Sequence, residues 1–385
     1  MASLPPPAGA THAMSERYDV AVIGAGVMGA SAALFLARGG MKVLLLDRGE
    51  LCREASGVNA GTLTLHMTRA ALIPYAQAGW RMWTSAAQWL GTGVDAVATA
   101  GLSLAFTDAE VEMLETRAAV RREHGADIRI IEPQRAMELE PGLNPQLLKA
   151  AWCETDGYAS AYLTGRAFRH ALVQAAVTVL EQRRVVGLES SDRGFTIRGA
   201  GSDAWIASRV VLAGGVWLGQ MLAWLGVSIA VKCLINQLIV TERLRPVMRT
   251  VLSVASGLLS LKQFGNGTVL IGGGWQGLGD PERGGVETLP DNLIGNLRLA
   301  RWTVPALAEA RITRIWLGLE AETADAMPLL GPVPGVRDAW VIGSAHSGYT
   351  SGPYLGQLLA EHLLGREPAH PLFDPARLVG VPLPH

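Results

Sequence analysis

Glycines at positions 24, 26 and 29 and an aspartate at position 47 are the residues of this chain whose spacing points most directly to chemistry. Gly24 permits a tight turn, Gly26 lets the backbone approach a pyrophosphate, and Gly29 lets a helix pack closely against a strand. The carboxylate of Asp47 can accept hydrogen bonds from a ribose hydroxyl. These residues predict a dinucleotide site, and they leave open whether the dinucleotide is NAD or FAD.

The elements predicted around these residues are the ones that such a site needs. An apolar strand at 19–23 leads into the glycines, a helix continues to about Arg38, and a second strand ends at Asp47. The N-terminus of that helix would offer unpaired N–H groups and the positive end of its dipole to the phosphates.

The rest of the chain alternates predicted strands and helices at both ends, with hairpin material between them. Asn266-Gly267 is typical of a tight turn between 258–264 and 268–273, and Thr107 with Glu110 forms a capping box. This order predicts one α/β domain interrupted twice. We expect helices at about 71–90, 108–124, 132–139, 162–177, 217–225, 290–303 and 352–364, and strands at 234–241, 312–319 and 339–342.

Composition limits the other classes of function. Charged residues make up 17% of the 385 residues and the net charge is −1, so we expect neither a nucleic acid nor an anionic membrane surface as a partner. Cys52, Cys153 and Cys233 lie far apart, which argues against a disulfide framework or a metal centre. Residues 1–16 contain three consecutive prolines and no apolar segment. We therefore expect a disordered tail, no secretory signal and a cytoplasmic protein.

One apolar segment, 210–231, carries no charged residue and is long enough to span a bilayer. The alternative is a buried strand meeting a turn at Gly214, followed by a short helix that ends at Gly226. Glycines and polar residues interrupt the segment and another strand follows at once, so the soluble alternative is favoured and no transmembrane segment is predicted.

Several spaced motifs resemble those of the D-amino acid oxidase-like FAD-dependent oxidoreductases. They are GAGVMG (24–29), ASGVNAG (55–61), VVLAGGVW (210–217), and a C-terminal pair at 316–331 and 343–353. This superfamily includes glycine and sarcosine oxidases and the β subunits of opine, proline and D-hydroxyproline dehydrogenases. The resemblance extends from Tyr18 to about Gly365.

The resemblance implies an α/β fold in which an antiparallel-sheet α+β substrate domain interrupts a Rossmann-like FAD-binding domain. The FAD-binding domain would comprise 17–95, 150–217 and 315–385, and the substrate domain 96–149 and 218–314.

The resemblance also implies FAD rather than NAD, because an enzyme that uses only NAD has no use for the later motifs. Gly318 occupies the position of the cysteine that tethers FAD in sarcosine oxidases, so we expect non-covalent FAD. The residues implied for FAD are Gly24, Ala25, Gly26, Val27, Met28, Gly29, Asp47, Arg48, Ser56, Asn59, Ala60, Gly61, Val185, Ala213, Gly214, Gly343, His346, Ser347, Gly348, Tyr349 and Thr350.

One departure from the family pattern concerns the substrate. The amino acid oxidases of the family have an arginine that pairs with the substrate carboxylate at the position of Glu320. Two like charges 4 Å apart repel by about 4 kcal/mol at an effective dielectric constant of about 20, so a carboxylate would not bind there. We expect either a substrate cation near Glu320 or a carboxylate held by Lys262, Arg69 or Arg314. The alternative is that Glu320 pairs with a structural arginine such as Arg314.

The other catalytic candidates follow from their motif positions. His346 would lie beside the flavin and orient the amine, or would donate to a backbone carbonyl. Trp275 would form a wall of the substrate cavity, or would anchor the core. Tyr349 and Lys262 complete the set, and the N-terminus of the 352–364 helix would stabilise negative charge on the flavin. Leu270-Ile271-Gly272 lacks the lysine of sarcosine oxidases, which favours poor reactivity with oxygen.

The resemblance implies oxidation of the C–N bond of an amine or amino acid by hydride transfer to flavin N5. A secondary amine is the favoured substrate: a cyclic imino acid, an N-substituted amino acid or an opine. We expect the catalytic β subunit of a heteromeric dehydrogenase with α and small γ subunits, with FMN allowed at a subunit interface and contact with the inner membrane only through partners. The alternatives are a stand-alone oxidase of the glycine or sarcosine type that uses O2, and a non-catalytic FAD-bearing scaffold subunit.

Overall fold

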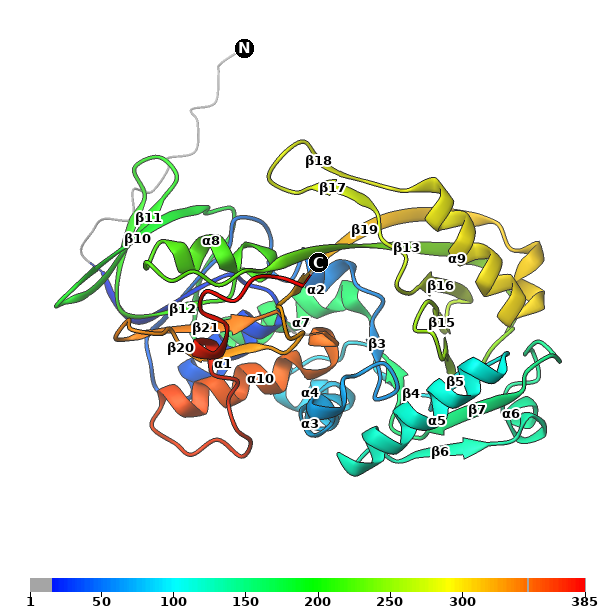
Figure 1. Cartoon of the computed structure of the whole chain (residues 1–385). Coiled ribbons are helices and arrows are strands. Elements are labelled where there is room, and N and C mark those ends of the chain that lie inside the picture. The colour runs from blue at the N-terminus through cyan, green and yellow to red at the C-terminus, as the bar shows by residue number, and fades with distance from the viewer. Residues whose placement is uncertain (1–15, 345, 385) are drawn as a thin grey trace, which may run out of the picture.

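The computed structural model describes residues 16–344 and 346–384, and it contains two eight-stranded sheets that lie side by side (Figure 1). The two longest strands, β13 (Lys232–Arg243) and β19 (Ile312–Glu322), pair with each other and run from one half of the molecule into the other. The predicted tail lies outside the described residues except for Glu16.

The first sheet is built on the predicted strand–glycine–helix–strand unit. β1 (Arg17–Ile23) pairs in parallel with both β2 (Val43–Leu46) and β12 (Ala204–Leu212). Its alternate residues enter separate cores on the two faces, so every position from Val20 onward is buried, as expected of a strand covered on both sides. The other strands are β9 (Thr178–Leu180), β10 (Val185–Ser191), β11 (Gly194–Gly199), β20 (Leu329–Pro332) and β21 (Ala339–Gly343).

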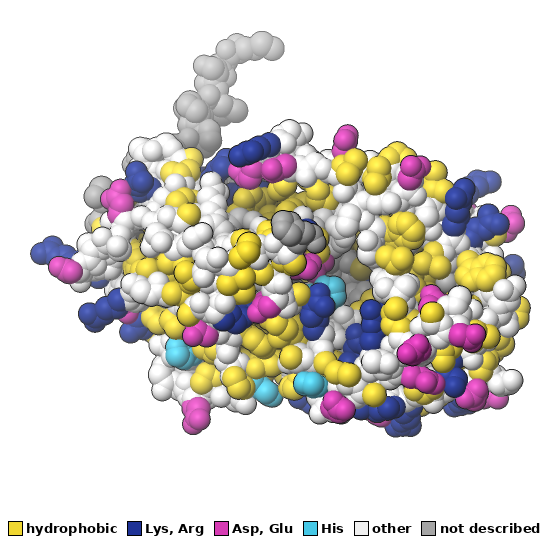
Figure 2. Space-filling model, in the orientation of Figure 1, with side chains coloured by type: hydrophobic (Ala, Val, Ile, Leu, Met, Phe, Trp, Pro, Cys, Tyr) yellow, Lys and Arg dark blue, Asp and Glu magenta, His cyan; other side chains and the backbone are white. Residues whose placement is uncertain are grey.

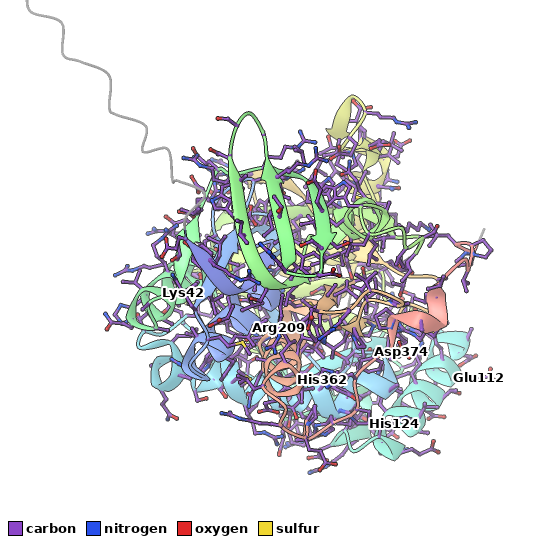
Figure 3. The ribbon with its side chains drawn as sticks, turned by 90° about the vertical axis from the view of Figure 1, so that its left-hand side faces the viewer. Lys42, Glu112, His124, Arg209, His362 and Asp374 are labelled. Atoms are coloured by element: carbon purple, nitrogen blue, oxygen red, sulfur yellow. The ribbon has the colours of Figure 1, made fainter. Side chains whose placement is uncertain are left out.

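Helices cover both faces of this sheet. On one face α1 (Val27–Arg38) packs against α10 (Gly348–Leu363), where Gly356 allows the close approach to Ser31. Further helices of this half are α2 (Ala55–Val58), α3 (Ile73–Thr84), α4 (Ala86–Leu90), α7 (Ala161–Gln174) and, in the core of the other face, α8 (Leu218–Ala223). Figure 3 shows this half from its outer side, with β10–β12 in front.

The second sheet is mostly antiparallel and has the order β19-β13-β16-β15-β14-β5-β7-β6. Its shorter strands are β5 (Gly101–Ala105), β6 (Ile128–Ile131), β7 (Lys149–Cys153), β14 (Val251–Val254), β15 (Ser260–Gln263) and β16 (Thr268–Gly272). The helices beside it are α5 (Asp108–Glu123), α6 (Pro133–Leu139) and α9 (Pro290–Thr303). Small pieces complete the fold: β3 (Thr62–Leu63), β4 (Val97–Ala98), β8 (Gly157–Tyr158), β17 (Leu278–Asp280) and β18 (Gly285–Glu287).

The predicted fold class is confirmed, and the differences are local. The expected helix at 71–90 is broken, because Ser85 separates α3 from α4. The C-terminal helix begins at Gly348 rather than near 352. The 210–231 segment forms the end of β12, a 3-10 turn and α8, and no described helix is long and apolar enough to cross a membrane.

Strand pairing also differs from the predicted domain limits. β7 and β19 fall largely within the stretches assigned to FAD binding, yet both pair in the second sheet. α8 falls within the predicted substrate domain, yet Leu218 and Leu222 are buried in the core of the first sheet. The strands with which β7 and β19 pair decide to which half they belong. The sequence of a strand alone does not identify the strand beside it in the sheet.

Candidate active site

A cavity of about 950 Å³ lies between the two halves and is lined by residues from both. Figure 2 shows this face hollowed between the halves, with Lys and Arg side chains and a histidine at the hollow. The volume is at the upper end of the range for small-molecule sites, so the cavity can hold a cofactor-sized ligand.

The glycine turn after β1 forms one end of this cavity, and its backbones are too close for side chains. Gly24 has φ +111°, and a Cβ there would lie 2.3 Å from the carbonyl oxygen of Ala213. A Cβ on Gly29 would lie 2.0 Å from the carbonyl oxygen of Gly24. The close approach that the spacing predicted therefore depends on glycine at both positions.

Asp47 and Ser56 converge on this turn from two other segments. The Asp47 carboxylate accepts the N–H of Ala25 at 2.6 Å and that of Gly49 at 2.7 Å, while burial raises its pKa. Ser56 Oγ accepts the N–H of Val27 at 2.9 Å. The acid at the end of β2 and the second glycine-rich segment thus fix the first turn of α1, and both line the cavity.

The same cavity is lined by Glu320 of β19, which pairs with His346. Glu320 Oε1 lies 3.0 Å from His346 Nδ1, and its Oε2 accepts from Asn236 Nδ2 at 2.7 Å. The bond to Glu320 raises the pKa of His346. Burial disfavours the Glu320 carboxylate, yet the bonds to His346 and Asn236 hold its pKa below the ordinary value. The pair therefore favours an anionic glutamate and a cationic histidine, and both side chains line the cavity.

The Glu320–His346 pair extends into a chain of amides. Asn236 Oδ1 accepts from Gln276 Nε2 at 2.6 Å. The Oε1 of Gln276 is buried without a hydrogen-bond partner among the described residues, and Gln276 lines the cavity. A buried acceptor without a donor is costly, so this oxygen suits a ligand that supplies an N–H.

Comparisons with known proteins decide the family. The model of the DAO family of FAD-dependent oxidoreductases matches residues 19–362. The chain belongs to this family. It is 27% identical over 380 residues to glycine oxidase from Geobacillus kaustophilus, covering 95% of this chain and 99% of that one. It is 28% identical over 348 residues to a subunit of opine oxidase from Rhizobium meliloti, covering 86% and 89%. The structure of L-proline dehydrogenase from P. horikoshii has a TM-score of 0.86 at 21% identity, covering 94% and 98%.

Membership confirms the predicted class of enzyme, a FAD-dependent oxidoreductase of amines or amino acids. The residues fit FAD: the glycine turn leaves room for phosphates, and Ser344 Oγ, which is buried without a described partner, lies on the same cavity. Of the residues expected to hold FAD, all except Ala25 and Gly61 line the cavity. Ala25 contributes its N–H to Asp47, and Gly61 packs against the backbone of Ala159.

Two further predicted residues occupy places that differ from their expected roles. Trp275 does not line the cavity, because its indole packs over Gly295 of α9 and donates to the carbonyl of Leu258 at 2.7 Å. Trp275 is thus an anchor of the second half. Arg314 is exposed, and Glu320 pairs with His346 instead. The alternative in which Arg314 is the structural partner of Glu320 is therefore wrong.

Lys262 is fully buried beneath the loop that precedes β3. Its ammonium donates to the carbonyl of Ala60 at 2.9 Å and to Thr62 Oγ1, and burial lowers its pKa to about 7. Ala60 and Thr62 line the cavity and Lys262 does not, so Lys262 supports the cavity wall from behind.

Tyr349 lines the cavity, but its polar groups are engaged. Its hydroxyl bonds Thr164 Oγ1 at 2.7 Å, its ring stacks on Trp83 with centroids 4.6 Å apart, and its carbonyl accepts from the Trp83 indole. Burial raises the pKa of this phenol. These contacts fix the first turn of α10, so Tyr349 positions the turn rather than exchanging protons.

Sequence reasoning missed Asn236 and Asp156. Asn236 reaches Glu320 because β13 pairs with β19 in a register that sets Leu234 opposite Glu320, and no local motif encodes that register. Asp156 is a buried hub that accepts from Thr64 Oγ1, the Leu65 N–H and His66 Nδ1. His66, Cys153 and Asp156 lie close enough together to hold a metal ion. However, the three hydrogen-bond donors already satisfy the Asp156 carboxylate.

Proposed function

We propose that this chain oxidises the C–N bond of an amine or amino acid, with a secondary amine favoured, as the catalytic β subunit of a heteromeric dehydrogenase. The observation that carries the proposal is the Glu320–His346 pair with its amide chain, which lines the same cavity as the glycine turn. The carboxylate of Glu320 and the amide oxygen of Gln276 support this proposal, because both prefer a group with N–H donors to a substrate carboxylate.

The residues of this chain would orient the substrate and set its protonation state. Gln276 Oε1 would accept the amine N–H, and Glu320 would attract an incoming substrate cation. The bond to Glu320 favours the protonated form of His346, which would lie beside the reacting nitrogen. FAD, when bound, supplies the acceptor for the hydride of the α-carbon. Non-covalent binding is part of the proposal, because Gly318 faces the cavity and offers no side chain for a covalent link.

The assignment as a subunit rests on the similarity to the opine oxidase chain from Rhizobium meliloti, which covers most of both chains. The proposal includes α and small γ subunits, allows FMN at a subunit interface, and gives the complex a cytoplasmic location with any membrane contact made through partners. A stand-alone oxidase that uses O2 is the second candidate, because glycine oxidase from Geobacillus kaustophilus matches nearly end to end.

The test is anaerobic reduction of the flavin in the purified holoprotein by proline, hydroxyproline isomers, sarcosine, opines and simple amines. Bleaching that persists in air and is relieved by an artificial acceptor supports the dehydrogenase subunit. Bleaching that reverses rapidly in air supports the oxidase. A yellow protein that no amine bleaches, alone or with its partner subunits, contradicts catalysis and favours a scaffold.

A further inference from the structure

The cavity continues beyond the Glu320–His346 pair into a second region lined by α5 and by the loop after β3. We name this region the basic lobe and define it by Arg69, Arg117, Arg121 and His66, all of which line the cavity. Residues of β14 and β5, including Ser253 and Ser103, form its floor. Figure 2 shows basic side chains gathered at this hollow.

The three guanidinium groups of the basic lobe form no direct ion pair within the described part of the chain, although the charge of Asp156 acts on Arg121 and that of Glu320 interacts with Arg69. No ion pair involves Arg69, Arg117 or Arg121 among residues 16–344 and 346–384. Arg117 donates to the carbonyl of Ala255, and Arg121 donates to that of Thr68. Burial and the neighbouring charges of Arg117 and Arg69 lower the pKa of Arg121 to about 10. Like charges held together around a cavity favour an anion there.

His66 adds a buried group that has no partner. Its Nδ1 lies 2.9 Å from Asp156, which is itself held by Thr64 and Leu65, so the ring is fixed in orientation. His66 is 8% exposed, and its Nε2 has no hydrogen-bond partner in the described structure. Because Asp156 engages Nδ1, Nε2 is the ring nitrogen left to bond a ligand in the same lobe.

Arg69 connects the basic lobe to the site of amine oxidation. It lies close enough to the Glu320–His346 pair that its charge lowers the pKa of both residues, and it also faces Arg121. A single ligand can therefore contact the amine site at one end and the basic lobe at the other.

We propose that the basic lobe binds a carboxylate that is remote from the reacting amine, so the preferred substrates are secondary amines that carry two carboxylates. This inference rests on the proposed function for the identity of the amine site. The phosphate of FMN offers the lobe the same oxyanion chemistry. We favour the carboxylate because the lobe and the amine site belong to one continuous cavity.

The kinetic test compares N-methylglutamate with N-methylglutamine, in which a neutral amide of nearly the same size replaces the carboxylate remote from the amine. We expect the dicarboxylate to reduce the flavin of the holoprotein with a KM about tenfold lower, because a charge-assisted pair is among the stronger hydrogen bonds. Arg117→Gln should raise the KM of the dicarboxylate about tenfold and that of N-methylglutamine less than twofold. Arg122→Gln is the control, because Arg122 is also on α5 but does not line the cavity.

Calorimetry of the holoprotein provides a readout that does not need turnover. Succinate and glutarate should bind more tightly than butyrate, and Arg117→Gln should abolish the difference. Tighter binding of FMN or inorganic phosphate, lost in the same variant, would assign the lobe to a phosphate and overturn the proposal. Equal KM values for the dicarboxylate and its comparison compound would also overturn the proposal. Because both compounds would still reduce the flavin, the proposed function would remain intact. If no amine reduces the flavin, the proposed function fails, while the dicarboxylate titration still decides the lobe.

Discussion

Glu320 gives the proposed amine site a negative charge, whereas a carboxylate-binding arginine at this position would give it a positive one. Its two oxygens are divided between His346 and Asn236, so one carboxylate both sets the protonation of the histidine and orients the amide chain. The pair stabilises the fold only where both groups are charged. Its contribution is lost as pH rises through the raised pKa of His346, and as pH falls through the lowered pKa of Glu320.

Replacing Glu320 by Gln should therefore change both the rate and its pH dependence. The variant loses a hydrogen bond to a charged group, worth about 1.5–3 kcal/mol, so kcat/KM for amine-dependent flavin reduction should fall roughly 10- to 100-fold. The pKa of His346 should fall, which moves the corresponding limb of the pH–rate profile to lower pH. Arg314→Gln should leave both quantities unchanged. The same loss in Arg314→Gln would restore Arg314 as a functional partner of Glu320.

Lys262 predicts a stability effect with a defined sign. The folded lysine titrates near 7 because of its burial, whereas the unfolded lysine keeps the ordinary value of 10.5. Between these values the unfolded chain binds more protons, so the free energy of unfolding should rise with pH from about 7 to 10.5. Urea denaturation of the holoprotein at several pH values measures this slope. Lys262→Met should flatten it, and an unchanged slope in the variant would assign the pH dependence to other groups.

At the scale of elements, the unit of β1, α1 and β2 could be predicted because each of its contacts follows from local spacing. The glycines, the apolar strand β1 and Asp47, which follows β2, all lie within one continuous segment of the sequence. The proposed amine site could not be predicted from local spacing, because Asn236 and Glu320 come together only through the register in which β13 pairs with β19. The sequence could not decide whether Trp275 lines the cavity or packs in the second half. That choice depends on α9, because the Trp275 ring packs over Gly295 of this helix.

The closeness of α1 to β1 makes a direct prediction about cofactor binding. In Gly29→Ala the new methyl group would meet the carbonyl of Gly24, so the turn must open and its N–H groups must move away from the phosphates. We expect the purified variant to retain less than a tenth of the wild-type flavin per chain, measured by absorbance. Gly93→Ala is the control, because a Cβ at that exposed glycine meets nothing within 4 Å. A fully yellow Gly29→Ala protein would contradict the predicted role of this contact.

At the scale of the whole molecule, a hairpin that departs from the second half reaches the FAD-binding half. The turn between β17 and β18 carries Glu282, which lies 3.6 Å from Arg48 and 3.8 Å from Arg184 and accepts from the Trp217 indole. The Arg48 guanidinium lies 3.4 Å from the centre of the Trp217 ring. Figure 1 shows this hairpin above the junction of the two halves. These contacts join the halves at the cavity wall next to Asp47.

Glu282→Gln should therefore weaken FAD binding without unfolding either half. The ion pairs are partly exposed and each contributes about 0.2–1 kcal/mol, so the loss of both should raise the Kd for FAD about two- to thirtyfold. Titration of the apoprotein with FAD, followed by the quenching of flavin fluorescence, measures this change. Glu287→Gln is the matched control, because Glu287 belongs to the same hairpin and forms no ion pair among the described residues. Increasing salt should narrow the difference between Glu282→Gln and wild type, because it screens these exposed pairs. Equal affinities of the two proteins at low salt would mean that the hairpin does not help to retain the cofactor.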